Sequence, residues 1–169
     1  MRASRCRRPS SRSAAKCRLI ISTAALWSNV TSRKSARPGS RASWTRPAGN
    51  VLHLARLTGV EVESALARRL RSGSLSAVHA AAARTLFRAD FRTRFHIVGI
   101  RAALVNQAMR LAERHFLRGY DAIHLAAALQ VHRRCLALGQ LLTLVSADAD
   151  LNAAALAEGL LVEDPNRHP

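Results

Sequence analysis

Hydrophobic and polar positions change period repeatedly after about residue 50, and the changes predict strands and helices in alternation. Short runs rich in Val, Leu and Ile predict buried strands. Longer stretches with apolar residues three and four positions apart predict amphipathic helices. The predicted strands are 51–57, 95–100, 141–146 and 160–162. The predicted helices are 59–70, 75–92, 102–115, 121–135 and 149–157.

The apolar positions also predict which helical faces pack inward. The stripe expected for helix 102–115 consists of Leu104, Ala108, Leu111 and Ala112. The face expected for helix 59–70 consists of Val60, Ser64 and 67–70. Ser72-Gly73-Ser74 predicts a turn, and Gly159 predicts the end of the last helix. Strands alternating with helices are typical of a mainly parallel sheet flanked by helices, so we expect a three-layer α/β domain.

The composition fits one domain without a membrane span. The chain has 169 residues, of which 49% are hydrophobic but only 4% aromatic, so Ala, Leu and Val must form the core. No apolar run approaches the roughly 20 residues that cross a bilayer. Cys6, Cys17 and Cys135 show no C-x-x-C spacing, and the His residues show no zinc-binding spacing. This usage fits a reducing cytoplasm and gives no indication of zinc.

Positive charge is concentrated at the start of the chain. The formal net charge is +17, yet residues 1–50 hold twelve of the 27 Lys and Arg and no acid. The remaining 15 basic residues face all 10 acidic ones, which leaves residues 51–169 only about +5. This charge is compatible with phosphate contacts to RNA, and equally with a solvated Arg-rich surface.

Acidic residues follow or begin apolar elements at several places. Asp121 lies at the start of the predicted helix 121–135, and Asp148 comes just after the predicted strand 141–146. In parallel α/β domains, ligands gather at such strand and helix ends. A cluster of carboxylates there would supply the oxygen ligands that Mg²⁺ prefers.

Four segments carry a family resemblance. They are Tyr120-Asp-Ala-Ile-His-Leu-Ala-Ala-Ala128, Val145-Ser-Ala-Asp148, Leu160-Leu-Val-Glu-Asp-Pro165 and Leu57-Thr-Gly-Val-Glu-Val-Glu-Ser-Ala-Leu-Ala-Arg-Arg69. Taken together in chain order, the segments resemble PIN-domain ribonucleases, in particular VapC-type toxins of type II toxin–antitoxin pairs. The resemblance covers roughly residues 50–165, and we assign residues 49–169 to a PIN-like domain.

The resemblance implies a site and a chemistry. Glu61, Asp121 and Asp148 would be catalytic and metal-ligating, with Ser146 and Asp150 as auxiliary residues. The cofactor would be Mg²⁺, with Mn²⁺ as an alternative, and it would activate a water for hydrolysis of an RNA phosphodiester. Implied partners are an RNA substrate, a small cognate antitoxin and a second copy of the chain in a homodimer.

Each site residue also has a plain structural interpretation. Asp121 and Asp148 both precede apolar helices, where a lone Asp is commonly an N-cap. Glu61 and Glu63 are two positions apart on a helix and cannot share a face, and Glu61 matches the family pattern better. Asp150 is expected to face solvent. We expect His124 to be a satisfied core histidine and Tyr120 to be a packing residue.

The first 48 residues do not fit the resemblance. A PIN domain opens with a strand that ends in Asp-(Ser/Thr)-Ser-Ala, but this chain has no acidic residue before Glu61. Its nearest equivalent is the apolar run Leu19–Leu26. The coding sequence of residues 20–46 can also be read in another frame, in which each codon consists of the last base of one codon and the first two bases of the next. Permitted choices of codon then give YLDSSAVVERYVTEIGPAWVTGLLDP. In this frame Trp44-Thr45 requires an Asp codon, because TGG followed by AC contains GAC. We interpret residues 1–48 as an anomalous basic segment, out of frame from about 19 to 47 or disordered.

Two other interpretations of this segment stay open. An Arg- and Ser-rich, acid-free segment is typical of a transit peptide, and also of a basic nucleic-acid-binding arm. On any of the three, the first carboxylate is missing. The expected function is therefore a Mg²⁺-dependent endoribonuclease toxin that is impaired in this chain. The alternative is a catalytically inactive PIN-like module that binds an antitoxin.

Overall fold

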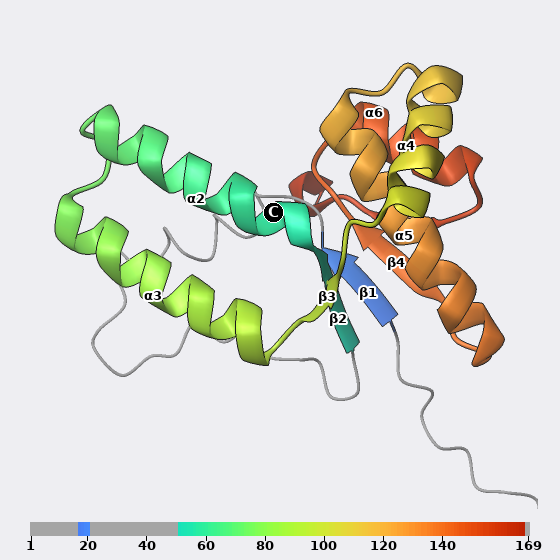
Figure 1. Ribbon diagram of the computed structural model, residues 1–169, viewed down its shortest axis with the longest axis horizontal. Helices are drawn as coiled ribbons and strands as arrows, with labels where there is room; N and C mark the ends of the chain where they lie inside the picture. The colour runs from blue at the N-terminus through green and yellow to red at the C-terminus, as the bar shows by residue number, and fades with distance from the viewer. Residues whose placement is uncertain (1–16, 21–50, 168–169) are drawn as a thin grey trace, which may run out of the picture.

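A five-stranded parallel sheet forms the centre of the computed structural model, which describes residues 17–20 and 51–167 (Figure 1). The strands are β1 (Cys17–Ile20), β2 (Val51–Ala55), β3 (His96–Val98), β4 (Leu142–Val145) and β5 (Leu161–Glu163). Their spatial order is β3-β2-β1-β4-β5, and every neighbouring pair is parallel. The predicted α/β class with a mainly parallel sheet is therefore confirmed.

The central strand comes from the basic N-terminal segment. Cys17 pairs with Val51 of β2 on one side and with Leu142 of β4 on the other. β1 overlaps the predicted opening run Leu19–Leu26 only at its first two residues, because positions 21–50 lie outside the described residues. The proposed out-of-frame reading and residues 1–16 likewise lie outside them, so the reading stays a prediction.

Helices cover both faces of the sheet. They are α2 (Arg56–Arg71), α3 (Ala77–Thr93), α4 (Ala102–His115), α5 (Gly119–Ala137) and α6 (Ala149–Ala157), followed by the short 3-10 helix η2 (Pro165–Arg167). One core cluster joins α4, α5 and α6 to the sheet, and a smaller one joins α2 and α3 to it. Side chains of β2 alternate between the two, since Leu52 and Leu54 belong to the smaller cluster and Ala55 to the larger.

The sequence located α4 and α6 at their observed bounds, and local signals explain why. Leu104, Ala108 and Leu111 are buried along one stripe of α4, as the periodicity predicted. Asp148 caps the N-terminus of α6, and Gly159 follows its C-terminus with a φ of 82°, where glycine is favoured. The predicted turn at Ser72–Ser74 is also present.

Two predictions about α2 were wrong. The helix begins at Arg56, not at Gly59, so β2 ends at Ala55 and the predicted strand was two residues too long. Gly59 lies close to α3, since an added Cβ would be only 3.2 Å from the Phe91 ring, which is tighter than an ordinary van der Waals contact. The face expected to pack inward was also wrong, since Val60 is 62% exposed.

The buried positions of α2 are Thr58, Val62 and Leu66. The apolar stripe predicted through Val60 therefore points away from the smaller cluster. In the part of the chain that the structure describes, no helix is long and apolar enough to span a bilayer.

Candidate acidic site

Three acidic residues come from three separate elements. Glu61 lies in the second turn of α2, which directly follows β2. Asp121 lies in the first turn of α5, and Asp148 follows the end of β4. Because the carboxyl ends of parallel strands share one edge of a sheet, residues that follow β2 and β4 are brought to that edge.

Asp121 is electrostatically coupled to Asp148 and, more weakly, to Glu61. Partial burial raises the pKa of the Asp121 carboxyl, and the negative charges of Asp148 and Glu61 raise it further. Positive charge on His124 and Arg118 acts in the opposite direction. A carboxyl with a raised pKa among like charges is a site that an incoming cation would relieve.

Asp121 is not the helix cap that its position allowed. The N-cap of α5 is Arg118, whose side chain makes no capping hydrogen bond, and Asp121 is the third helical residue. The Asp121 carboxyl is half-buried. The plain structural interpretation therefore does not account for this residue.

Asp148 does act as a cap. Its Oδ1 accepts a hydrogen bond from the Leu151 backbone N–H at 2.9 Å, at the first turn of α6. The Asp148 backbone N–H donates to the hydroxyl of buried Ser146 at 3.1 Å. Ser146 thus shapes the turn that carries Asp148 and contacts its backbone. Asp150 is exposed, as expected.

Glu61 forms a hydrogen bond with His124, a residue that the sequence predicted to be a core histidine without a functional role. His124 is only 1% exposed, and its Nε2–H donates to Glu61 Oε2 at 3.0 Å. Its buried Nδ1 has no hydrogen-bond partner among the described residues, so the expectation of a fully satisfied histidine was wrong. The available signal was spacing, since His124 lies three residues after Asp121 and so near it on α5.

Glu63 is occupied elsewhere. Its two carboxylate oxygens accept from Arg84 Nε at 3.1 Å and from Arg88 Nε at 2.7 Å, both on α3. Glu63 therefore joins α2 to α3, while Glu61 points to α5. The structure separates the two glutamates as the two-residue helical spacing required.

Two exposed aromatic side chains lie where α4 ends and α5 begins. Tyr120 is 64% exposed, so the prediction that it packs inward was wrong. Phe116 is 94% exposed and adopts the left-handed conformation, with a φ of 55°. The Leu117 N–H bonds back to the Ala112 carbonyl, so Phe116 occupies the position in this helix ending where glycine is usual.

Two of the predicted ligands, Asp121 and Asp148, have the chemistry that an oxygen-bound divalent cation requires. Asp121 and Asp148 are hard carboxylate ligands, and Mg²⁺ is commonly held by one or two carboxylates while retaining waters. Across residues 17–20 and 51–167, however, no three His, Cys, Asp or Glu side chains are placed to bind one ion. A cation near Asp121 would relieve the repulsion from Asp148 and Glu61, but the described residues do not by themselves form a complete ligand set.

Comparison with solved structures identifies the fold. No family model and no curated protein sequence matches the chain. The structure of PAE2754 from Pyrobaculum aerophilum is similar, with a TM-score of 0.57 and 21% identity over 90% of this chain and 88% of that one. So is a chain of VapBC2 from Rickettsia felis, solved with a DNA fragment from its promoter. There the TM-score is 0.53, with 14% identity over 87% of this chain and 98% of that one.

At these identities the likeness concerns the fold alone. The chain has a PIN-like fold, as its sequence motifs predicted.

Proposed function

We propose that this chain is a toxin-type endoribonuclease of reduced activity, which hydrolyses RNA phosphodiesters in the presence of Mg²⁺, with Mn²⁺ as an alternative. The observation that supports the proposal best is the half-buried Asp121 carboxyl, whose pKa is raised first by burial and then by the negative charges of Asp148 and Glu61. Clustered carboxylates with perturbed pKa values are typical of catalytic sites. The PIN-like fold supports the same class of protein.

Each residue has a distinct role in this proposal. Asp121 and Asp148 would hold the cation, which supplies an activated water and neutralises charge on the scissile phosphate. Glu61, oriented by His124, would accept a proton from that water or fix its position. Ser146 holds the turn that presents Asp148, and Asp150 would act at the outer edge of the site.

Reduced activity follows from the ligand count. The family pattern places its first Asp after the opening strand, but no acidic residue precedes Glu61 in this chain. The central strand β1 is Cys17-Arg-Leu-Ile20, which supplies no carboxylate. With fewer carboxylates around it, the cation would be bound less tightly and held less rigidly in line with the substrate.

The partners proposed with this function are an RNA substrate, a small antitoxin and a second copy of the chain, in the cytoplasm. The structurally similar VapBC2 carries the name of a toxin–antitoxin complex. This similarity supports an antitoxin partner for this chain. The moderate positive charge of residues 51–169 suits phosphate contacts.

A metal titration tests the catalytic proposal. Purified full-length chain is incubated with structured RNA at increasing Mg²⁺ or Mn²⁺, beside Asp121→Asn and Asp148→Asn. We expect slow, metal-dependent cleavage that falls at least roughly tenfold in each variant. Glu113→Gln, an exposed acid on α4, is the matched control and should cleave like the wild type. Equal rates in all four proteins would assign the cleavage to a contaminant.

A catalytically inactive antitoxin-binding module is the second candidate. One feature favours it, namely the absence of an acidic residue before Glu61. The test is a calorimetric titration of the chain with the product of any short reading frame that lies beside its gene and encodes a DNA-binding N-terminus. Tight binding without any metal-dependent cleavage favours the module, whereas cleavage that the antitoxin inhibits favours the enzyme.

A further inference from the structure

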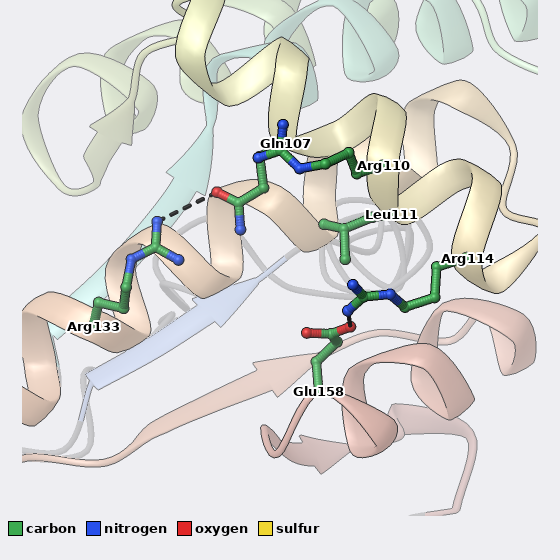
Figure 2. A pocket seen from close by; sticks show the side chains of 6 residues that line it. All are labelled: Gln107, Arg110, Leu111, Arg114, Arg133 and Glu158. Carbon is green, nitrogen blue, oxygen red and sulfur yellow. Dashed lines mark hydrogen bonds and ion pairs between the residues drawn. The ribbon is translucent and has the colours of Figure 1, made fainter.

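A cavity of about 330 Å³ lies among α4, α5 and the C-terminal end of α6 (Figure 2). Its lining residues are Gln107, Arg110, Leu111, Arg114, Arg133 and Glu158. Half of them are arginines, and Leu111 is the one apolar side chain. Such a lining is unlike that of a site for an apolar ligand, in which hydrophobic and aromatic side chains predominate.

Helical spacing places the arginines of α4 together. Arg110 and Arg114 are four residues apart, so their side chains follow one face of the helix. Gln107 precedes Arg110 by one turn on that face. Arg133 reaches the same cavity from α5, and its Nη2 donates to Gln107 Oε1 at 3.3 Å (Figure 2).

The positive charge of the cavity is only partly compensated. Glu158 Oε1 accepts from Arg114 Nη1 at 3.0 Å and from His115 Nε2 at 2.8 Å, and the His115 hydrogen bond is the main cause of its lowered pKa. Arg133 contacts a neutral amide, so its charge is retained. Arg110 forms no ion pair within the described part of the chain.

We propose that this cavity is a phosphate-binding site, for a free phosphate group or for a phosphodiester of a polynucleotide. Guanidinium groups present N–H donors in a planar fork that matches phosphate oxygens, and they stay charged at every physiological pH. The volume accommodates one phosphate group with its first waters. The hydrogen bonds to Gln107 and Glu158 hold two of the three arginines in place before a ligand arrives.

The phosphate site does not depend on the proposed nuclease activity. Arg133 lies twelve residues after Asp121 on α5, which is about 18 Å along the helix axis. The two sites can therefore be removed separately. If the ligand is a polynucleotide, the arginines would act as positioning residues for a segment distant from the acidic residues.

Calorimetric titration with inorganic phosphate is the direct test, on the full-length chain at low ionic strength. The informative variants are Arg110→Gln, Arg133→Gln and the double variant. Arg92→Gln, an exposed arginine on α3, is the matched control. We expect phosphate affinity to fall roughly tenfold or more in the double variant and to be unchanged in Arg92→Gln. The thermal unfolding of each variant is measured as a control for folding. Its melting temperature should match that of the wild type, because the altered side chains are exposed.

A second titration distinguishes the source of the phosphate. Single-stranded RNA is bound in the presence of EDTA, so that no cleavage occurs. If the ligand is a polynucleotide, the double variant binds RNA more weakly, and the magnitude of its log–log salt slope falls by about 0.7, the value for one lost phosphate contact on a single strand. If RNA binding is unchanged while phosphate binding is lost, the site takes a free phosphate compound.

Two results would overturn the proposal. One is equal phosphate affinity of the wild type and the double variant. The other is a wild type that binds no phosphate but binds an acidic peptide through these arginines, because the cavity would then be a carboxylate-binding surface.

Discussion

The helices α3 and α5 each contain a run of alanines, but the two helices have very different surroundings. α5 contains Ala126-Ala-Ala128 and α3 contains Ala80-Ala-Ala-Ala83. In α5 the whole alanine run is buried between α4 and the sheet, whereas α3 buries only Ala80 and Ala83. Figure 1 shows the hairpin of α2 and α3 extending away from the sheet. Burial here is set by what covers a helix, and local composition does not determine it.

The two regions are also stabilised by different forces. The α4–α5–α6 side rests on a large apolar cluster, which includes Leu125, Leu142 and Leu144. The α2–α3 hairpin combines a small cluster with the two ion pairs of Glu63. Apolar burial contributes far more free energy than partly exposed ion pairs do. We therefore expect α3 to open locally before α5 does.

The largest effect is expected in the α5 core. Leu125→Ala should lower the free energy of unfolding by about 2–5 kcal/mol, because it leaves a cavity at a fully buried position. Guanidinium denaturation measures this loss. Leu138→Ala, at an exposed leucine just after α5, is the control and should change stability by less than about 0.5 kcal/mol. Similar losses in both variants would mean that α5 is not the centre of the core.

A smaller and more local effect is expected at Glu63. Glu63→Gln removes both ion pairs to α3 and should cost about 1 kcal/mol or less, because the partners are partly exposed. Hydrogen exchange should accelerate in α3 and stay unchanged in α5. Asp90→Asn, which breaks a single i,i+4 pair with Arg94, is the control. Equal acceleration in α5 would show that the hairpin does not open by itself.

Substitutions at two left-handed helix ends, Phe116 and Gly159, should change the stability in opposite directions. Phe116→Gly should stabilise the fold by about 0.5–1 kcal/mol, because Phe116 holds a left-handed conformation while its side chain is 94% exposed. Gly159→Ala, at a matching helix end with a φ of 82°, should destabilise it by about 1 kcal/mol. Thermal unfolding measures both. Destabilisation by Phe116→Gly would mean that the phenyl ring contributes to folding.

The smallest effect is expected where the two regions meet, at the acidic site. The folded-state pKa of Asp121 is raised, so its ionisation opposes folding above that pKa. Asp121→Asn should therefore unfold at a higher temperature than the wild type at neutral pH. The difference should shrink as the pH falls through the raised pKa, because the wild-type carboxyl then becomes neutral.

Added Mg²⁺ sharpens this prediction. If Asp121 binds the cation, Mg²⁺ stabilises the wild type and leaves Asp121→Asn unchanged. Thermal unfolding at several pH values, with and without Mg²⁺, measures both effects. A wild type more stable than the variant at neutral pH without metal would contradict the direction of the pKa shift.

Sequence alone was sufficient wherever a local signal set the structure. Helix α4 follows from its apolar stripe, and α6 follows from the Asp148 cap and Gly159, so both helices were predicted at their observed bounds. The strand–helix alternation gave the parallel α/β class. The order of motifs, from Glu61 through Asp121 to Asp148, pointed to the fold that comparison with solved structures supports.

Only the tertiary structure decided what depends on contacts between distant residues. In the folded chain, Cys17–Ile20 forms the central strand of the sheet. Gly59 lies inside α2 against Phe91 and does not begin the helix. His124 forms a hydrogen bond with Glu61. The tertiary structure also gathered the arginines of α4 and α5 around one cavity. Periodicity and capping act within one or two turns of chain, whereas these contacts are fixed by how whole elements pack.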